Sequence, residues 1–207
     1  MEELIDKFEL SFYKDIQSNE KIKNVEKKFT SRALPDLVNM FFEVYSSNSL
    51  MNFYKETNGF EARWEYDLKR NLCGRMNIIA LEYVLESWEE KLYFEGADER
   101  LKYFRPLDIF TEEACVGILV DGSGDETLYY HEFGDSDIFS LDIDFKSYFD
   151  LSIDAKVFLY WQEYLVELVH GNQGVEVLFK TGMKEVFSDF DLETFTAKFD
   201  SLRFFKS

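Results

Sequence analysis

Cysteine, proline and glycine are scarce in this chain, and each scarcity excludes a class of protein. Only two cysteines occur among 207 residues, Cys73 and Cys115, so a disulfide scaffold is excluded. Only 10 glycines and 2 prolines occur, which excludes collagen-like and linker-like sequences. The longest uninterrupted apolar run, CVGILV at 115–120, is far shorter than the roughly 20 apolar residues of a membrane-spanning helix.

Acidic residues outnumber basic residues in this chain. The chain has 23 lysines and arginines against 41 aspartates and glutamates, a net charge of −18. A surface this acidic repels nucleic-acid phosphates and anionic membranes, so we expect neither as a partner. It attracts cations, basic peptides and basic proteins, although such a charge also serves solubility alone. The N-terminal residues carry too many charges for a signal peptide, so we expect a soluble, cytoplasmic protein with reduced cysteines.

Apolar side chains are abundant. The hydrophobic fraction is 46% and the aromatic fraction is 18%, which is too much buriable surface for a disordered chain. The length predicts one domain over 1–207. An aromatic content this high can leave an exposed apolar patch, so a homodimer is an open alternative.

The first half of the chain shows helical spacing and then strand alternation. Apolar residues three and four apart predict a helix over 1–16 and a broken helical region from Pro35 to Gly59. The basic stretch between these regions is expected to be a solvated face or loop. Period-two alternation then predicts a strand over 60–66, and a second strand is expected over 73–81.

The second half predicts a hairpin followed by helices. A short helix over 82–90 and a charged loop around 96–100 come first. Apolar strands over 114–120 and 128–133 flank a tight turn at 121–125, which predicts a β-hairpin. A short strand near 138–141 precedes helices over 145–152 and 157–169, and the tail holds two amphipathic segments, the last with Asp191 as its N-cap. This order predicts an α+β fold in which helices flank a mainly antiparallel sheet.

Catalytic and metal-binding motifs are missing. The sequence has no Gly-x-Ser-x-Gly, no phosphate-binding loop and no dinucleotide fingerprint. His131 and His170 lack the paired spacing of a zinc site, and a calcium loop that begins at Asp135 is interrupted by apolar residues. Cys115 and His131 would form a thiol dyad only if adjacent strands brought them together, and such a Cys is more often a small buried hydrophobe. We therefore predict no metal, no cofactor and no catalysis, with an enzyme or small-ligand protein as the outside alternative.

Carboxylates are the most prominent chemical feature. Several of them cluster in the hairpin turn and in the loop that follows the hairpin. Loops concentrate functional contacts, and close charge pairs across an interface raise association rates. A generic solvated surface is the competing interpretation. We predict as partner-facing charges Asp121, Asp125, Asp135 and Asp137.

A succession of short motifs runs along the middle of the chain: Leu34-Pro35-Asp36, Phe53-Tyr54, Asn58-Gly59, Trp64, Phe104-Arg105-Pro106-Leu107-Asp108, Glu112-Glu113, Cys115–Val120, Tyr129-Tyr130-His131 and Phe145-Lys146-Ser147-Tyr148-Phe149. This succession resembles the SUKH superfamily, the group of the yeast cell-wall-assembly regulator and many bacterial immunity proteins. The resemblance covers about 34–171, which leaves 1–33 and 172–207 as helical extensions at the two ends.

The resemblance implies function as well as fold. It implies an α+β domain without catalysis that binds a protein partner in the cytoplasm. In bacterial members the partner is commonly a toxin of the nuclease or deaminase class, which suits an acidic binder because a nuclease surface that holds phosphates is basic. The alternative is a regulatory interaction module of the cell-wall-regulator type, without a toxin partner.

Overall fold

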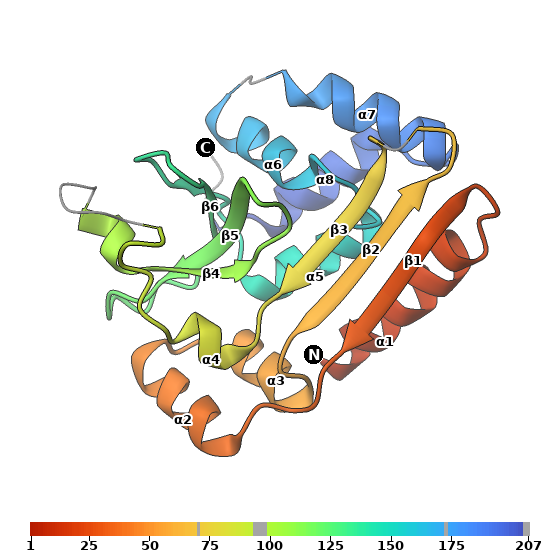
Figure 1. Ribbon diagram of the computed structural model, residues 1–207. Helices are drawn as coiled ribbons and strands as arrows, with labels where there is room; N and C mark the ends of the chain where they lie inside the picture. The colour runs from red at the N-terminus through yellow and green to blue at the C-terminus, as the bar shows by residue number, and fades with distance from the viewer. Residues whose placement is uncertain (70, 93–98, 172–173, 205–207) are drawn as a thin grey trace.

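Alternating apolar residues build an antiparallel sheet in which sequence neighbours are also spatial neighbours. The computed structural model describes residues 1–69, 71–92, 99–171 and 174–204, and within them seven strands pair in the order β1 to β7 (Figure 1). The strands are β1 (Ile22–Phe29), β2 (Phe60–Tyr66), β3 (Cys73–Ile78), β4 (Phe104–Asp108), β5 (Ala114–Leu119), β6 (Tyr129–Glu132) and β7 (Phe139–Ser140). The predicted α+β fold with helices flanking an antiparallel sheet is confirmed.

Helices precede, interrupt and follow the sheet. The helices are α1 (Glu2–Ser11), α2 (Pro35–Val44), α3 (Asn48–Glu56), α4 (Leu81–Val84), α5 (Phe145–Asp154), α6 (Trp161–His170), α7 (Val175–Val186) and α8 (Leu192–Leu202). A π-helical turn, η1 (Phe12–Gln17), continues α1, and a 3₁₀ turn, η2 (Glu99–Lys102), precedes β4. As predicted, Asp191 caps α8, because its side chain accepts hydrogen bonds from the backbone N–H groups of Glu193 and Thr194.

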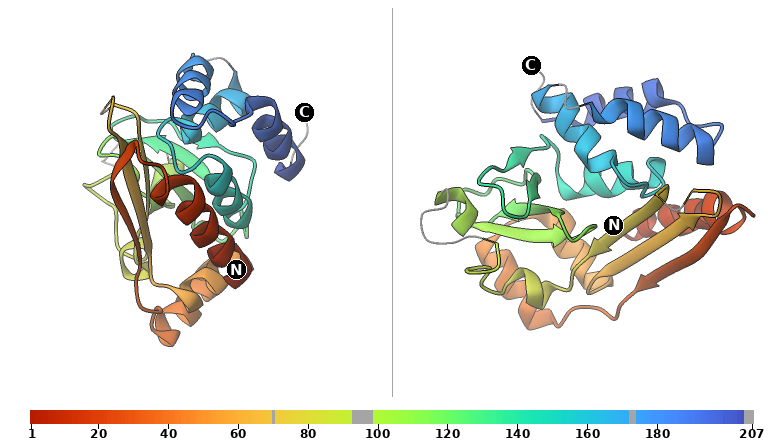
Figure 2. Two further views of the ribbon diagram at one scale, coloured as in Figure 1. Left: turned by 90° about the vertical axis from the view of Figure 1, so that its right-hand side faces the viewer. Right: turned by 45° about the horizontal axis from the view of Figure 1, so that its top comes forward.

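The helical layer covers one face of the β1–β3 half of the sheet (Figure 2). Phe60, Ala62, Trp64 and Tyr66 point into this layer and are buried, whereas the residues between them are half-buried or exposed. An aromatic cluster joins α1 and α5 to the sheet, with Phe8 and Phe149 each within 6 Å of the Phe60 ring centroid. The opposite face of β1–β3 is consequently open and polar.

The sheet divides between β3 and β4. Only one Cα pair, Ile78 with Asp108, joins these strands, and the Asp108 carboxylate accepts a hydrogen bond from the Asn77 N–H at 2.7 Å. Beyond that point β3 pairs with the connection between α5 and α6, where the Arg75 N–H donates to the Val157 carbonyl at 2.7 Å. The strands β4 to β6 carry a second, smaller core on the face away from the helices, formed by Leu92, Leu101, Phe104, Cys115, Leu119 and Ile138.

Two local predictions are wrong, and a third is correct only in part. Most of the basic connector belongs to β1, an edge strand, although its lysines are largely solvated as expected. The segment 1–33 is therefore not purely helical. The helix predicted over 157–169 begins only at Trp161, because 157–159 pairs with β3. The helix predicted over 82–90 is a single turn, α4.

Strand β4 was not predicted. Of the charged loop expected around 96–100, residues 96–98 lie outside the described part of the chain, and Glu99 and Arg100 belong to η2. Among the described residues, no helix combines the length and apolar character that crossing a bilayer requires.

Candidate functional site

Negative charge is concentrated in one stretch of the chain, the acidic segment 106–145. This segment runs from β4 to the start of α5 and contains no lysine and no arginine. Its eleven acidic residues are Asp108, Glu112, Glu113, Asp121, Asp125, Glu126, Glu132, Asp135, Asp137, Asp142 and Asp144. Segment 106–145 therefore carries a charge of −11, whereas the net charge of the whole chain is −18.

Most of these carboxylates lack a cationic partner. Among the described residues, Asp142 is the only member of the acidic segment in an ion pair, with the Arg203 guanidinium at 2.7 Å. Elsewhere in the molecule, acidic side chains form ion pairs with lysines, as in Lys7–Asp150 at 2.6 Å and Lys156–Asp15 at 2.5 Å. The field of the acidic segment is consequently left available to an external cation.

Asp121 and Asp125 lie in loop 120–128, between β5 and β6. Asp121 is exposed, and hydrogen bonds from Ser123 lower its pKa. Asp125 is half-buried, and although burial raises its pKa, hydrogen bonds from Thr127 and the Tyr129 hydroxyl bring the value below the ordinary one. Both side chains therefore remain negative at neutral pH in a loop that their own hydrogen bonds hold in shape.

Asp135 and Asp137 lie in loop 133–138, between β6 and β7, and both are exposed. The Asp135 carboxylate accepts a hydrogen bond from the Ser136 N–H at 2.7 Å. The carbonyl of Asp137 bonds with Nδ1 of the buried His131 at 2.9 Å. That bond anchors the loop to the smaller core and leaves the Asp137 side chain toward solvent.

The structure brings the four predicted residues together in two pairs, not in one cluster. Because β6 connects the two loops, they lie at its opposite ends. Loop 120–128 adjoins Tyr45, whose pKa is raised by burial and by Glu126 and Asp125. The other end of β6 adjoins α6, where burial and the charges of Glu132 and Glu113 raise the pKa of Glu163. Tyr45 thus adjoins one pair of carboxylates and Glu163 lies at the end of β6 that carries the other pair. Sequence spacing alone revealed neither neighbour.

The Cys115–His131 pair is buried beyond the reach of a substrate. The two residues are directly opposite in the β5–β6 ladder, and both are fully buried. Burial raises the pKa of the Cys115 thiol well above its ordinary value. A thiolate nucleophile is disfavoured there, because reactive cysteines need an electropositive and partly exposed setting.

A buried carboxyl group at Asp108 was not anticipated as a special residue. Its side chain accepts hydrogen bonds from the Asn77 N–H at 2.7 Å and from the Tyr148 hydroxyl at 2.6 Å. The Gln162 amide donates in turn to the Tyr148 hydroxyl at 3.4 Å. Burial is the largest influence and raises the pKa of Asp108 to about 6. The carboxyl group joins both halves of the sheet to α5 and α6, which is a structural position and not a substrate site.

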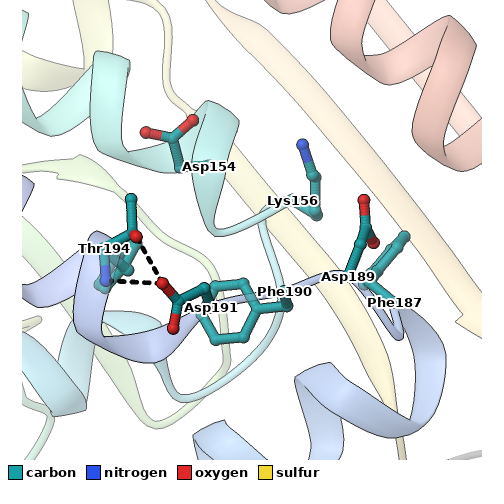
Figure 3. Close-up of a pocket in the computed structure, with 8 residues that line it drawn as sticks. Asp154, Lys156, Phe187, Asp189, Phe190, Asp191 and Thr194 are labelled. Carbon is teal, nitrogen blue, oxygen red and sulfur yellow. Dashed lines mark hydrogen bonds between the residues drawn. The ribbon is translucent and has the colours of Figure 1, made fainter.

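A surface hollow of about 260 Å³ opens between α5 and the start of α8 (Figure 3). Asp154, Lys156, Asp189 and Asp191 line it together with phenylalanine rings. Asp191 is committed to capping α8 through Thr194, and Asp154 pairs with Lys198 at 2.6 Å. The polar groups of the hollow therefore stabilise helix termini and helix contacts.

Within 1–69, 71–92, 99–171 and 174–204, no three His, Cys, Asp or Glu side chains are arranged to hold a metal ion. Comparison of the chain with protein-family models, with curated proteins and with solved structures found no match.

Proposed function

We propose that the protein acts by binding a basic protein partner and that this partner is a toxin of the nuclease or deaminase class, which it neutralises in the cytoplasm. The observation that carries the proposal is the acidic segment 106–145, with eleven carboxylates and no lysine or arginine. Only one of these carboxylates has an ion-pair partner among the described residues. The resemblance to the SUKH superfamily supports the choice of a toxin as the partner.

Electrostatics gives this arrangement a definite function in association. Opposite potentials on two proteins steer diffusional encounter and can raise the association rate by orders of magnitude at low salt. A nuclease surface that binds phosphates must be basic, so an acidic surface of comparable charge density competes for it directly. Exposed charges are screened within about 8 Å at physiological ionic strength. The proposed complex should therefore weaken steadily as salt is added.

The direct test is titration of the purified chain with the purified catalytic domain of a toxin encoded beside its gene. We expect binding at low salt, inhibition of the toxin, and weaker binding as salt increases. Neutralising Asp121, Asp125, Asp135 and Asp137 together, to asparagine, should weaken binding and flatten its salt dependence without changing the fold. No binding at low salt would end the claim for that toxin and favour the regulatory-module alternative.

A matched control separates local charge from total charge. Four exposed acids on other elements, changed to their amides, remove the same net charge: Asp6, Glu20, Glu176 and Asp200. This control variant should bind almost as well as the unmodified chain. Equal losses in both quadruple variants would show that net charge alone is responsible, which would contradict a binding role for the acidic segment.

A further inference from the structure

Helix α2 has an apolar stripe in addition to its buried face. Its buried face is formed by Val38 and Phe41, which pack into the main core. Leu37, Met40 and Val44, spaced by three and four residues, form a neighbouring stripe. Met40 is 48% exposed and Val44 is 46% exposed. Two large apolar side chains at successive turns of one helix are thus left without cover.

The contacts of α3 and α5 place loop 120–128 at the C-terminal end of this stripe. The rings of Phe41 and Tyr54 are 6.2 Å apart, and those of Phe53 and Phe145 are 5.1 Å apart, which joins α2 through α3 to the start of α5. The N–H of Leu128 donates to the carbonyl of Ile143, just before α5, at 2.9 Å.

Two further residues adjoin the loop. Tyr45, directly after Val44, has its pKa raised by burial and then by the charges of Glu126 and Asp125. At the other end of the loop, the carbonyl of Tyr103 accepts a hydrogen bond from the Val120 N–H at 2.9 Å, and the Tyr103 side chain is 46% exposed. Apolar and acidic groups therefore adjoin at this end of the sheet.

We propose that the partner docks at this end, on a surface that we call the α2–loop surface, and that the partner is a basic protein domain with an apolar contact at the centre of its basic patch. The proposal rests on the proposed function and adds the location of the interface. The α2–loop surface consists of Met40, Val44, Tyr103, Asp121, Asp125 and Glu126.

This surface combines the two kinds of side chain that a protein interface usually contains, apolar groups and charged groups. Apolar and aromatic side chains that become buried carry most of the binding energy, whereas surrounding charges set encounter rate and orientation. The carboxylates have no cation of their own among the described residues, so they complement a basic partner and repel a second copy of this chain. A basic domain therefore fits better than a homodimer.

The acids at the opposite end of β6 lack an apolar counterpart. Among the described residues, none of the exposed large apolar side chains lies on β6, on β7 or in loop 133–138. Asp135 and Asp137 there can add to long-range attraction, but they offer no apolar group to bury. The α2–loop surface is thus the end at which both contributions to binding coincide.

The test uses a synthetic leucine–lysine peptide that folds as a helix with one apolar face and one basic face. Titrated into the ¹⁵N-labelled chain, it should shift amide resonances in α2 and in loop 120–128. Shifts centred on loop 133–138, shifts spread evenly over the acidic segment, or no binding at low salt would each overturn the proposed location.

Two double variants give the matched comparison. Met40→Ser with Val44→Ser should weaken peptide binding by about tenfold or more, because exposed anchors are removed without a change of charge. Val177→Ser with Leu178→Ser removes two exposed apolar side chains from α7 and should leave binding unchanged. Equal effects of the two pairs would overturn the proposal.

The toxin titration separates this proposal from the proposed function. If the toxin domain binds and the Met40/Val44 variant binds it equally well, the location is wrong and the function survives. If the toxin domain does not bind while the peptide behaves as expected, the function is wrong and the surface survives.

Discussion

Replacing the buried carboxyl group of Asp108 by an amide should make the protein more stable at neutral pH. Asp108 is fully buried, and burial raises its pKa from 3.8 to about 6. The folded state therefore holds this proton more tightly than the unfolded state does. Between these two pH values folding takes up a proton, so the contribution of Asp108 to stability falls as pH rises and is fully lost above about pH 6.

The expected magnitude follows from the same two values. Each pKa unit corresponds to about 1.4 kcal/mol, so a difference of about two units corresponds to about 3 kcal/mol. The Asp108→Asn variant keeps an acceptor for the Asn77 N–H, and its amide can donate to the Tyr148 oxygen. Tyr148 can then turn its proton toward the Gln162 amide oxygen, which has no hydrogen-bond partner among the described residues.

Urea unfolding, followed by tryptophan fluorescence at several pH values from 3.5 to 7, measures this effect. Wild type and Asp108→Asn should have similar free energies of unfolding at the acidic end. The variant should be more stable by about 3 kcal/mol at the neutral end. Asp200→Asn, an exposed change on α8, controls for the loss of one negative charge. A difference between wild type and Asp108→Asn that does not vary with pH would refute the reasoning.

Two further substitutions test the packing and capping of the fold. Gly74→Ala should destabilise the protein by about 1–3 kcal/mol, because the added Cβ would overlap Nε1 of the buried Trp64. Urea unfolding measures the loss, and unchanged stability would contradict this packing. Asp191→Ala should cost about 1 kcal/mol in unfolding free energy by removing the N-cap of α8, whereas Asp191→Asn should largely retain it. Equal losses in the alanine and asparagine variants would contradict the capping explanation.

Local sequence patterns were enough to predict the segments whose conformation depends mainly on their own residues. The Asn58-Gly59 pair ended α3 as predicted, and Gly59 has a φ of +122°, which only glycine adopts without strain. Strict alternation located β2, and the turn residues between two apolar runs located the β5–β6 hairpin. In each case the periodicity and the turn chemistry agree with the fold.

Segments whose conformation depends on a distant partner were missed. β1 carries several lysines and only weak alternation, which is typical of a protected edge strand, and its pairing with β2 decides its conformation. β4 contains Pro106, which weakens the strand signal. The apolar residues 157–159 fit a helical pattern, but they form backbone hydrogen bonds with the edge of β3 instead.

The candidate site was predictable residue by residue but not as an arrangement. Sequence reasoning correctly placed Asp121, Asp125, Asp135 and Asp137 in loops around one hairpin. Their separation into two pairs follows from the course of β6. The proximity of Tyr45 to loop 120–128 depends on helix packing between segments at least 75 residues apart in the sequence, which no local pattern records.

The salt dependence of toxin binding tests the central idea most directly, because attraction between exposed charges is the component that salt removes. Affinity of the unmodified chain for the toxin domain should fall steeply with increasing salt, and the variant neutralised at Asp121, Asp125, Asp135 and Asp137 should show a shallower slope. An affinity that is independent of salt, or identical slopes for the two chains, would contradict the account.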